Sequence, residues 1–196
     1  MFKTLPIWRL QVPRVAGFKN ALRKTLKRGI LFFYSIGEII LDKVFHFRSP
    51  RENYVCDAAV IWCFDHRFDV VFRNFLERIY VMNPDVIKIA GGSKCLASPG
   101  NDVERDFILN QIRTSMRMHA TKRVLLMAHS DCGAYGGLAA FGNDAQREAD
   151  HHQRELARAT KNLLTAIPGL EVRSYFMDFE GVYDAQVSRG ARSQAD

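Results

Sequence analysis

Four apolar runs, separated by segments long enough for helices, most constrain how this chain folds. They extend from Val55 to Cys63, Val86 to Ala90, Arg123 to Ala128 and Glu171 to Phe179. The first three resemble buried strands, and the last alternates apolar with polar residues. Strands joined by helices imply βαβ crossovers, so we expect an α/β fold, with a mainly parallel β-sheet flanked by helices.

The segments between these runs carry helical patterns. Val70 to Met82 has apolar residues at helical spacing, and Asn101 with Glu104 resembles the capping box that begins a helix. That second helix is expected to direct six residues inward: Phe107, Ile108, Gln111, Ile112, Ser115 and Met118.

A third helix is expected from Ala145 to Ala166 and is highly charged. Adjacent residues of a helix point to different faces, and His151 and His152 lie in its most polar stretch. We therefore expect both histidines on a solvated face.

Positive charge is concentrated at the N-terminal end. Residues 1–50 hold ten of the 28 Lys and Arg residues but two of the 21 Asp and Glu residues, so the rest of the chain is nearly neutral. We expect three parts: a basic amphipathic helical arm (1–50), an α/β domain (51–184) and a polar, frayed tail (185–196).

The arm allows two interpretations. Between residues 18 and 47 the apolar positions form one helical face, which either packs on a partner subunit or lies on an anionic membrane surface. Subunit packing is favoured, because a charge stripe is usually a solvated face. Nucleic acid is not an expected partner, since the body lacks basic patches interleaved with aromatic residues.

Four cysteines do not form a disulfide framework in a chain of 196 residues, and no signal peptide is evident. The longest stretch without charge, Gly29 to Gly37, is too short to span a bilayer. A reducing, cytoplasmic compartment is therefore expected, and there Cys and His residues more often bind metals than form bridges.

Two short motifs follow the first and third runs. Cys63 ends the first run, His129 follows the third, and Cys132 lies three residues beyond it. The carboxyl ends of parallel strands meet at one edge of a sheet, so the three side chains are expected to converge. Two thiolates and an imidazole suit Zn²⁺ in tetrahedral geometry and leave one position open.

Asp65 and Arg67 accompany the first motif. Asp65 lies two residues after Cys63, and a bidentate ion pair with Arg67 would hold it beside the metal. Without Arg67, the carboxylate could become the fourth ligand and close the site.

Cys-x-Asp-x-Arg followed by His-x-x-Cys-Gly resembles the β-class carbonic anhydrases, and the resemblance covers about residues 55–184. It implies zinc held by Cys63, His129 and Cys132, with Asp65 and Arg67 as the catalytic dyad. It further implies a lyase (carbonate dehydratase) in which zinc-bound hydroxide converts carbon dioxide reversibly to bicarbonate, and a homodimer or higher homo-oligomer.

The chain departs from the family pattern at two places. His66 replaces the usual Ser between Asp65 and Arg67, and the family's Arg-Asn-Ala-Gly-Asn stretch is represented by Ala90-Gly91 alone. His66 is either a proton shuttle or, as we favour, a hydrogen-bonding or interface residue.

Two alternative functions therefore stay open. The same zinc site could act on another small heterocumulene, COS or CS₂, or the protein could bind zinc without catalysis, with Asp65 closing the site. Of the remaining thiols, Cys95 is expected in a pocket wall and Cys56 in the core.

Overall fold

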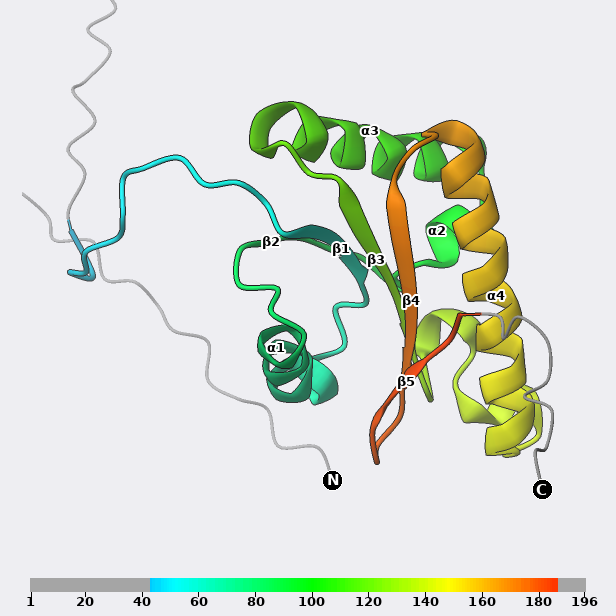
Figure 1. The fold of residues 1–196 in the computed structure, drawn as a ribbon. Helices are drawn as coiled ribbons and strands as arrows, with labels where there is room; N and C mark the ends of the chain where they lie inside the picture. Colours follow the sequence, from blue (N-terminus) through cyan, green and yellow to red (C-terminus); the bar gives the residue numbers. More distant parts are fainter. Residues whose placement is uncertain (1–42, 187–196) are drawn as a thin grey trace, which may run out of the picture. The chain divides into compact units, whose positions relative to one another are not determined.

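A five-stranded sheet forms the centre of the computed structural model, which describes residues 43–186 (Figure 1). The strands lie in the order β2-β1-β3-β4-β5, and all neighbours are parallel except β4 and β5, which are antiparallel. This confirms the mainly parallel α/β fold. The strands are β1 (Ala58–Trp62), β2 (Pro84–Lys88), β3 (Arg123–His129), β4 (Glu171–Met177) and β5 (Val182–Asp184).

Helices cover both faces of the sheet. Figure 1 shows α1 on one face and α2, α3 and α4 on the other. Their bounds are α1 Asp69–Arg78, α2 Lys94–Ala97, α3 Asp102–His119 and α4 Ala145–Ala166, with 3₁₀ turns at η1 His66–Phe68, η2 Gly133–Tyr135 and η3 Leu138–Phe141.

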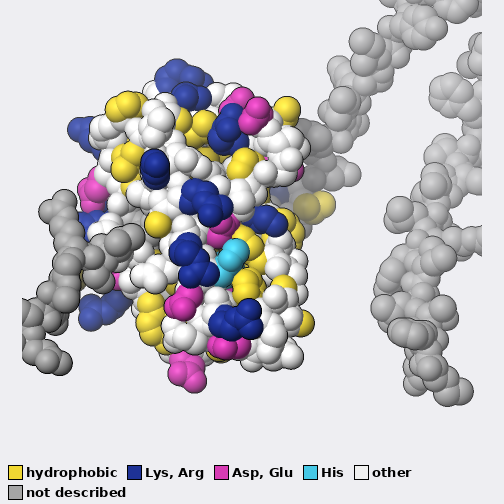
Figure 2. Space-filling view, turned by 90° about the vertical axis from the view of Figure 1, so that its right-hand side faces the viewer, with side chains coloured by type: hydrophobic (Ala, Val, Ile, Leu, Met, Phe, Trp, Pro, Cys, Tyr) yellow, Lys and Arg dark blue, Asp and Glu magenta, His cyan; other side chains and the backbone are white. Residues whose placement is uncertain are grey.

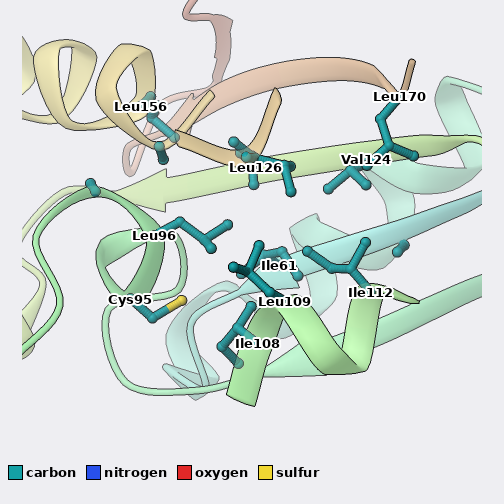
Figure 3. Packing of buried hydrophobic residues seen from close by; sticks show 14 of the residues in the cluster. Ile61, Cys95, Leu96, Ile108, Leu109, Ile112, Val124, Leu126, Leu156 and Leu170 are labelled. Atoms are coloured by element: carbon teal, nitrogen blue, oxygen red, sulfur yellow. The ribbon is translucent and has the colours of Figure 1, made fainter. Parts of the chain in front are cut away.

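The central strands β1 and β3 are buried on both faces, which explains why their sequences are almost continuously apolar. Alternate residues enter separate cores: Ile61 and Leu126 pack under α2, α3 and α4, whereas Trp62 and Met127 pack under α1. Figure 3 shows the first core, where Ile61 and Leu126 meet Leu156 of α4 and Ile112 of α3.

Two strand and helix boundaries differ from expectation. β2 begins at Pro84, where a stop was expected; an edge strand tolerates proline at its first residue, because no ladder hydrogen bond is lost there. α1 ends at Arg78, four residues before Met82, and Tyr80 adopts a left-handed φ of 59°.

The inward face of α3 was only partly predicted. Ile108, Ile112 and Ser115 are buried, but Phe107 is 55% and Met118 65% exposed, and Gln111 is exposed too. Leu109 takes their place in the core, so the apolar stripe is turned by about one residue from the expected one. The Asn101 cap was correct: its side chain accepts a hydrogen bond from the Glu104 N–H.

The expected solvated position is wrong for His152, and His151 is half-buried. The His152 side chain is fully buried, stacked on Phe176 and in edge contact with Tyr135. α4 has a 22-residue amphipathic pattern, and its buried stripe passes through this polar stretch, so position along the helix outweighs local composition.

Four basic side chains are exposed along α4: Arg147, Arg154, Arg158 and Lys161. Figure 2 looks onto this side and shows Lys and Arg side chains spread over it, with acidic groups between them.

The expected arm and tail lie mostly outside the described residues. Lys43 to Ser49, the described end of the arm, contain no helix, so the expected helix does not continue to Phe47. A short segment of β-branched and aromatic residues before Pro50 favours extended backbone. Within residues 43–186, no helix is both long and apolar enough to cross a membrane.

Candidate metal centre

Cys63, His129 and Cys132 converge at the carboxyl edge of the sheet. Cys63 follows the last residue of β1, His129 ends the neighbouring strand β3, and Cys132 precedes η2. All three side chains are buried, and their potential ligand atoms lie within 4.8 Å of one another. In the described part of the chain, no other group of three or more potential metal ligands meets this criterion.

The hydrogen bonding of His129 leaves one ring nitrogen free for a metal. Its Nδ1 lies 2.8 Å from the Ser130 carbonyl oxygen, which can only accept, so Nδ1 carries the proton. The other nitrogen, Nε2, is buried and has no hydrogen-bond partner. A buried nitrogen lone pair beside two thiols is the donor that a zinc site requires.

The two thiols do not ionise equally without a metal. The Cys132 thiol donates to Cys63, which lowers the pKa of Cys63, and backbone N–H groups of Asp65 and Gly91 add to that effect. The neighbouring Cys63 thiolate in turn raises the pKa of Cys132. A divalent cation would remove this conflict, because it favours both sulfurs in the thiolate form.

Close backbone packing positions Cys63. Gly92, in the turn after β2, has a left-handed φ of 52°, and a Cβ there would lie 2.9 Å from the Met127 carbonyl oxygen and 3.0 Å from the Cys63 nitrogen. The adjacent Ser93 hydroxyl donates to the same Met127 oxygen. The Ala90-Gly91-Gly92 turn therefore packs directly against the ends of β1 and β3.

The loop that carries Cys132 is fixed at several points. The Ser130 N–H donates to the Met177 carbonyl of β4, and the Asp131 N–H donates to the Glu148 carboxylate of α4. Glu148 is 1% exposed, and burial raises its pKa. This anchor comes from α4, so α4 contributes to the site without offering a ligand.

Asp65 and Arg67 form a bidentate pair beside the ligands. Arg67 Nη2 donates to Asp65 Oδ2 at 2.6 Å, and Arg67 Nε donates to Oδ1 at 3.0 Å. The pair lowers the pKa of Asp65 to about 2, so this carboxylate is ionised at neutral pH. Its oxygens are not part of the converging ligand group.

Arg67 also contacts residues that the sequence did not single out. Its Nη1 donates to Asp131 Oδ2 at 2.8 Å, and its guanidinium lies 5.8 Å from the Phe68 ring centroid and 5.4 Å from that of Phe179. Asp131 lies between the ligands His129 and Cys132, so an acidic residue inside the motif was the available signal. Phe179 had none, because it reaches the site from the β4–β5 turn.

The other singled-out residues lie apart from the ligand group. His66 is 95% exposed and its Nδ1 lies 3.3 Å from Asp69. Cys56 is buried, two residues before β1 begins. Cys95 is buried, as Figure 3 shows, and lines a cavity of about 500 Å³ together with Lys94 and Glu104, so it lies in a pocket wall as expected.

Comparison with known families agrees with this geometry. A family model described as "Putative carbonic anhydrase" matches residues 54–186, which include all five site residues and every described helix and strand. The chain belongs to this carbonic anhydrase family. The resemblance to the β class is thereby confirmed, with the chain as a divergent member.

Individual relatives are distant. An "Uncharacterized protein" of Rickettsia bellii is 22% identical over 142 residues, covering 71% of this chain and 85% of the relative. The β-carbonic anhydrase isoform I of Trichomonas vaginalis aligns over 71% of this chain and 87% of its own, at 15% identity and a TM-score of 0.49. Streptococcus mutans carbonic anhydrase aligns over 68% and 83%, at 16% identity and 0.47.

Proposed function

We propose that this protein is a zinc enzyme that hydrates carbon dioxide reversibly to bicarbonate. The convergence of Cys63, His129 and Cys132 around an unpartnered His129 nitrogen, in a chain of this family, carries the proposal. A bound zinc ion supplies a Lewis acid that lowers the pKa of water at its open position.

The chain's own residues orient that water. Asp65 is ionised at neutral pH, so its carboxylate can only accept a hydrogen bond, and it accepts from a water O–H. Arg67 fixes the direction of the Asp65 oxygens through two parallel N–H donors. The dyad therefore lowers the entropic cost of orienting the attacking water, and its contribution to the rate comes from this orientation.

Metal analysis tests the ligand assignment. We expect about one zinc per chain in the purified protein, lost on Cys63→Ser or His129→Ala, because removing one of three ligands destroys the site. Cys56→Ser is the matched control: this thiol is also buried, but it lies before β1, at the end away from Cys63, and the change should leave zinc content unchanged. Wild-type protein without zinc would refute the proposal.

Stopped-flow measurement of CO₂ hydration tests the reaction. We expect zinc-dependent activity that falls by about 10²-fold or more on Asp65→Ala or Arg67→Ala at full zinc content. Hydration of CO₂ no faster than buffer would contradict the proposal. Turnover of COS or CS₂ in its place would indicate a different heterocumulene, and no turnover at full zinc content would indicate a non-catalytic zinc protein.

Assembly and location are further parts of the proposal. We infer a cytoplasmic homodimer or higher homo-oligomer, in which apolar residues of the N-terminal arm pack on a partner subunit. Three large apolar side chains exposed along α3 support a subunit interface: Val103, Phe107 and Met118. Contact of the basic arm with an anionic membrane is the competing interpretation.

A further inference from the structure

Arg67 is held by more than its partner in the dyad. Besides the Asp131 carboxylate, its guanidinium bonds the Asp131 main chain: Nη2 donates to that carbonyl oxygen at 3.0 Å. Asp131 thus accepts two of the N–H groups of Arg67, and the rings of Phe68 and Phe179 flank the same guanidinium. A residue with this many partners is a fixed part of the site and not a free side chain.

Asp131 is itself fixed, so it can act as an anchor. It adopts a left-handed φ of 53°, its N–H donates to Glu148 at 2.8 Å, and its Oδ1 accepts from the Leu138 N–H at 3.0 Å. Gly137 approaches so closely that a Cβ there would lie 2.9 Å from Asp131 Oδ1. Contacts from α4, from η3 and from Gly137, the residue before η3, therefore fix the position of Asp131. None of these contacts involves Arg67.

Phe179 is set by the turn between β4 and β5. Asp178 Oδ1 accepts hydrogen bonds from the Glu180 and Gly181 N–H groups, which closes the turn and directs Phe179 toward the site. The Phe179 ring lies 5.2 Å from that of Phe68 and remains 65% exposed. An aromatic residue this exposed contributes little to the core, and its described ring contacts are with Phe68 and Arg67.

We propose that Asp131 and Phe179 are positioning residues that keep Arg67 on Asp65 and so keep the Asp65 carboxylate off the metal. The inference rests on the proposed metal site. A carboxylate released from its guanidinium close to a divalent cation is attracted to that cation, and Asp65 lies two residues after the candidate ligand Cys63. With Arg67 held from the opposite side, Asp65 stays turned away and the fourth position stays open.

The test measures how well an external anion reaches that position. The full chain is loaded with Co²⁺ in place of zinc, and thiocyanate binding is followed by visible absorption. Asp131→Asn should weaken thiocyanate binding about fivefold, the scale of losing one partly exposed ion pair, because Asp65 then competes for the metal. Asp69→Asn is the matched control: Asp69 is also ion-paired, to Lys88, but it does not contact Arg67.

A second background separates positioning from a structural role. In Asp65→Ala protein there is no carboxylate to compete, so Asp131→Asn should no longer change thiocyanate affinity. A loss of equal size in both backgrounds would mean that Asp131 only shapes the loop, and it would overturn the proposal. An effect no larger than that of Asp69→Asn would overturn it as well.

Phe179→Leu keeps the proposal testable if Asp131→Asn fails to hold cobalt. We expect about twofold weaker thiocyanate binding, from the loss of one exposed cation–π contact, and again none in the Asp65→Ala background. Tyr80→Leu, another exposed aromatic position, is its control. If neither Asp131→Asn nor Phe179→Leu alters affinity, Arg67 needs no support and the inference is wrong.

These outcomes are independent of the reaction. A wild type that binds metal and hydrates CO₂, with no difference among the variants, would refute the inference alone. If Asp131→Asn weakens thiocyanate binding only when Asp65 is present, but the wild type does not hydrate CO₂, the inference is supported and the proposed reaction is refuted.

Discussion

Individual residues at the sheet edge are constrained by backbone as much as by chemistry. Gly92 has no ligand role, yet a Cβ at this position would lie 2.9 Å from the Met127 carbonyl oxygen and 3.0 Å from the Cys63 nitrogen. A turn that packs this closely against two strand ends requires glycine, both for its left-handed φ and for the missing Cβ. The position of Cys63 therefore depends on a residue from the next βα connection.

Gly92→Ala should lower the free energy of unfolding by about 2 to 5 kcal/mol, from left-handed strain plus overpacking against backbone. Gly169→Ala is the control: its φ is 87°, but no heavy atom lies within 4 Å of an added Cβ, so strain of about 1 to 2 kcal/mol is expected alone. Urea unfolding of both variants gives the comparison. Equal losses would show that the close packing around Gly92 is unimportant.

The convergence of the three candidate ligands was predictable from sequence, but much of what supports them was not. Cys63, His129 and Cys132 follow apolar runs, and parallel strands bring such ends together whatever the details of packing. Asp131 and Phe179 act through side-chain directions set by a left-handed loop residue and a hairpin turn. Neither the loop nor the turn has a periodic sequence pattern from which the direction of these side chains could be predicted.

At the scale of elements, α4 shows where pattern and composition disagree. Its bounds were predicted from Ala145 to Ala166 and confirmed, because Asp144 caps it and Ile167-Pro168 ends it. Its buried face was mispredicted at His152, where the core around Phe176 required an aromatic ring and accepted an imidazole. The short helix α2 was missed altogether, since four residues cannot display a helical period.

His152 should make the fold sensitive to mild acid. Burial lowers its pKa from 6.5 to about 4. Between pH 6.5 and 4, His152 is therefore protonated in the unfolded chain but stays neutral in the folded chain. Stability is therefore retained above pH 6.5 and lost as pH falls toward 4, by up to about 3 kcal/mol for this group.

Replacing the imidazole should remove that part of the pH dependence. His152→Leu is expected to lose less stability than wild type between pH 6.5 and 4, measured by urea unfolding at each pH. His66→Leu is the matched control, because the His66 side chain is 95% exposed. A His152→Leu profile parallel to that of wild type would show that this histidine does not contribute to acid sensitivity.

At the scale of the whole molecule, the strand order explains why the position of the site does not reveal how the protein assembles. The candidate ligands lie at the carboxyl ends of β1 and β3 in the centre of the sheet, whereas β2 and β5 are its edges. Edge strands and exposed apolar side chains can associate with another chain, whereas the central strands are already paired on both sides. The fold could thus be predicted from the sequence without its assembly, because strand count and helical spacing do not determine which surface a second copy covers.

Light scattering of the full chain should give a mass that is a whole multiple, two or more, of 22.4 kDa and stays constant above the micromolar range. Zinc-stripped protein serves as a comparison, since it shows whether assembly depends on the site. A mass of one chain at every concentration would contradict the oligomer.

Liposome pelleting tests the competing role of the basic arm. If the arm lies on membranes, recovery with anionic vesicles should exceed recovery with neutral vesicles and fall as salt rises, because exposed charges are screened. Since we favour subunit packing, we expect low recovery with both kinds of vesicle at physiological salt. High, salt-sensitive recovery with anionic vesicles alone would reverse that preference.

The single antiparallel strand matters beyond the sheet that it completes. Because β5 returns beside β4, the chain makes a tight hairpin whose tip stands over the Asp65–Arg67 pair, while every metal ligand comes from elsewhere. A hairpin tip can gain or lose residues without shifting the parallel core. The aromatic cover on Arg67 can therefore change with the length of one turn, while the candidate metal ligands and the fold are left as they are.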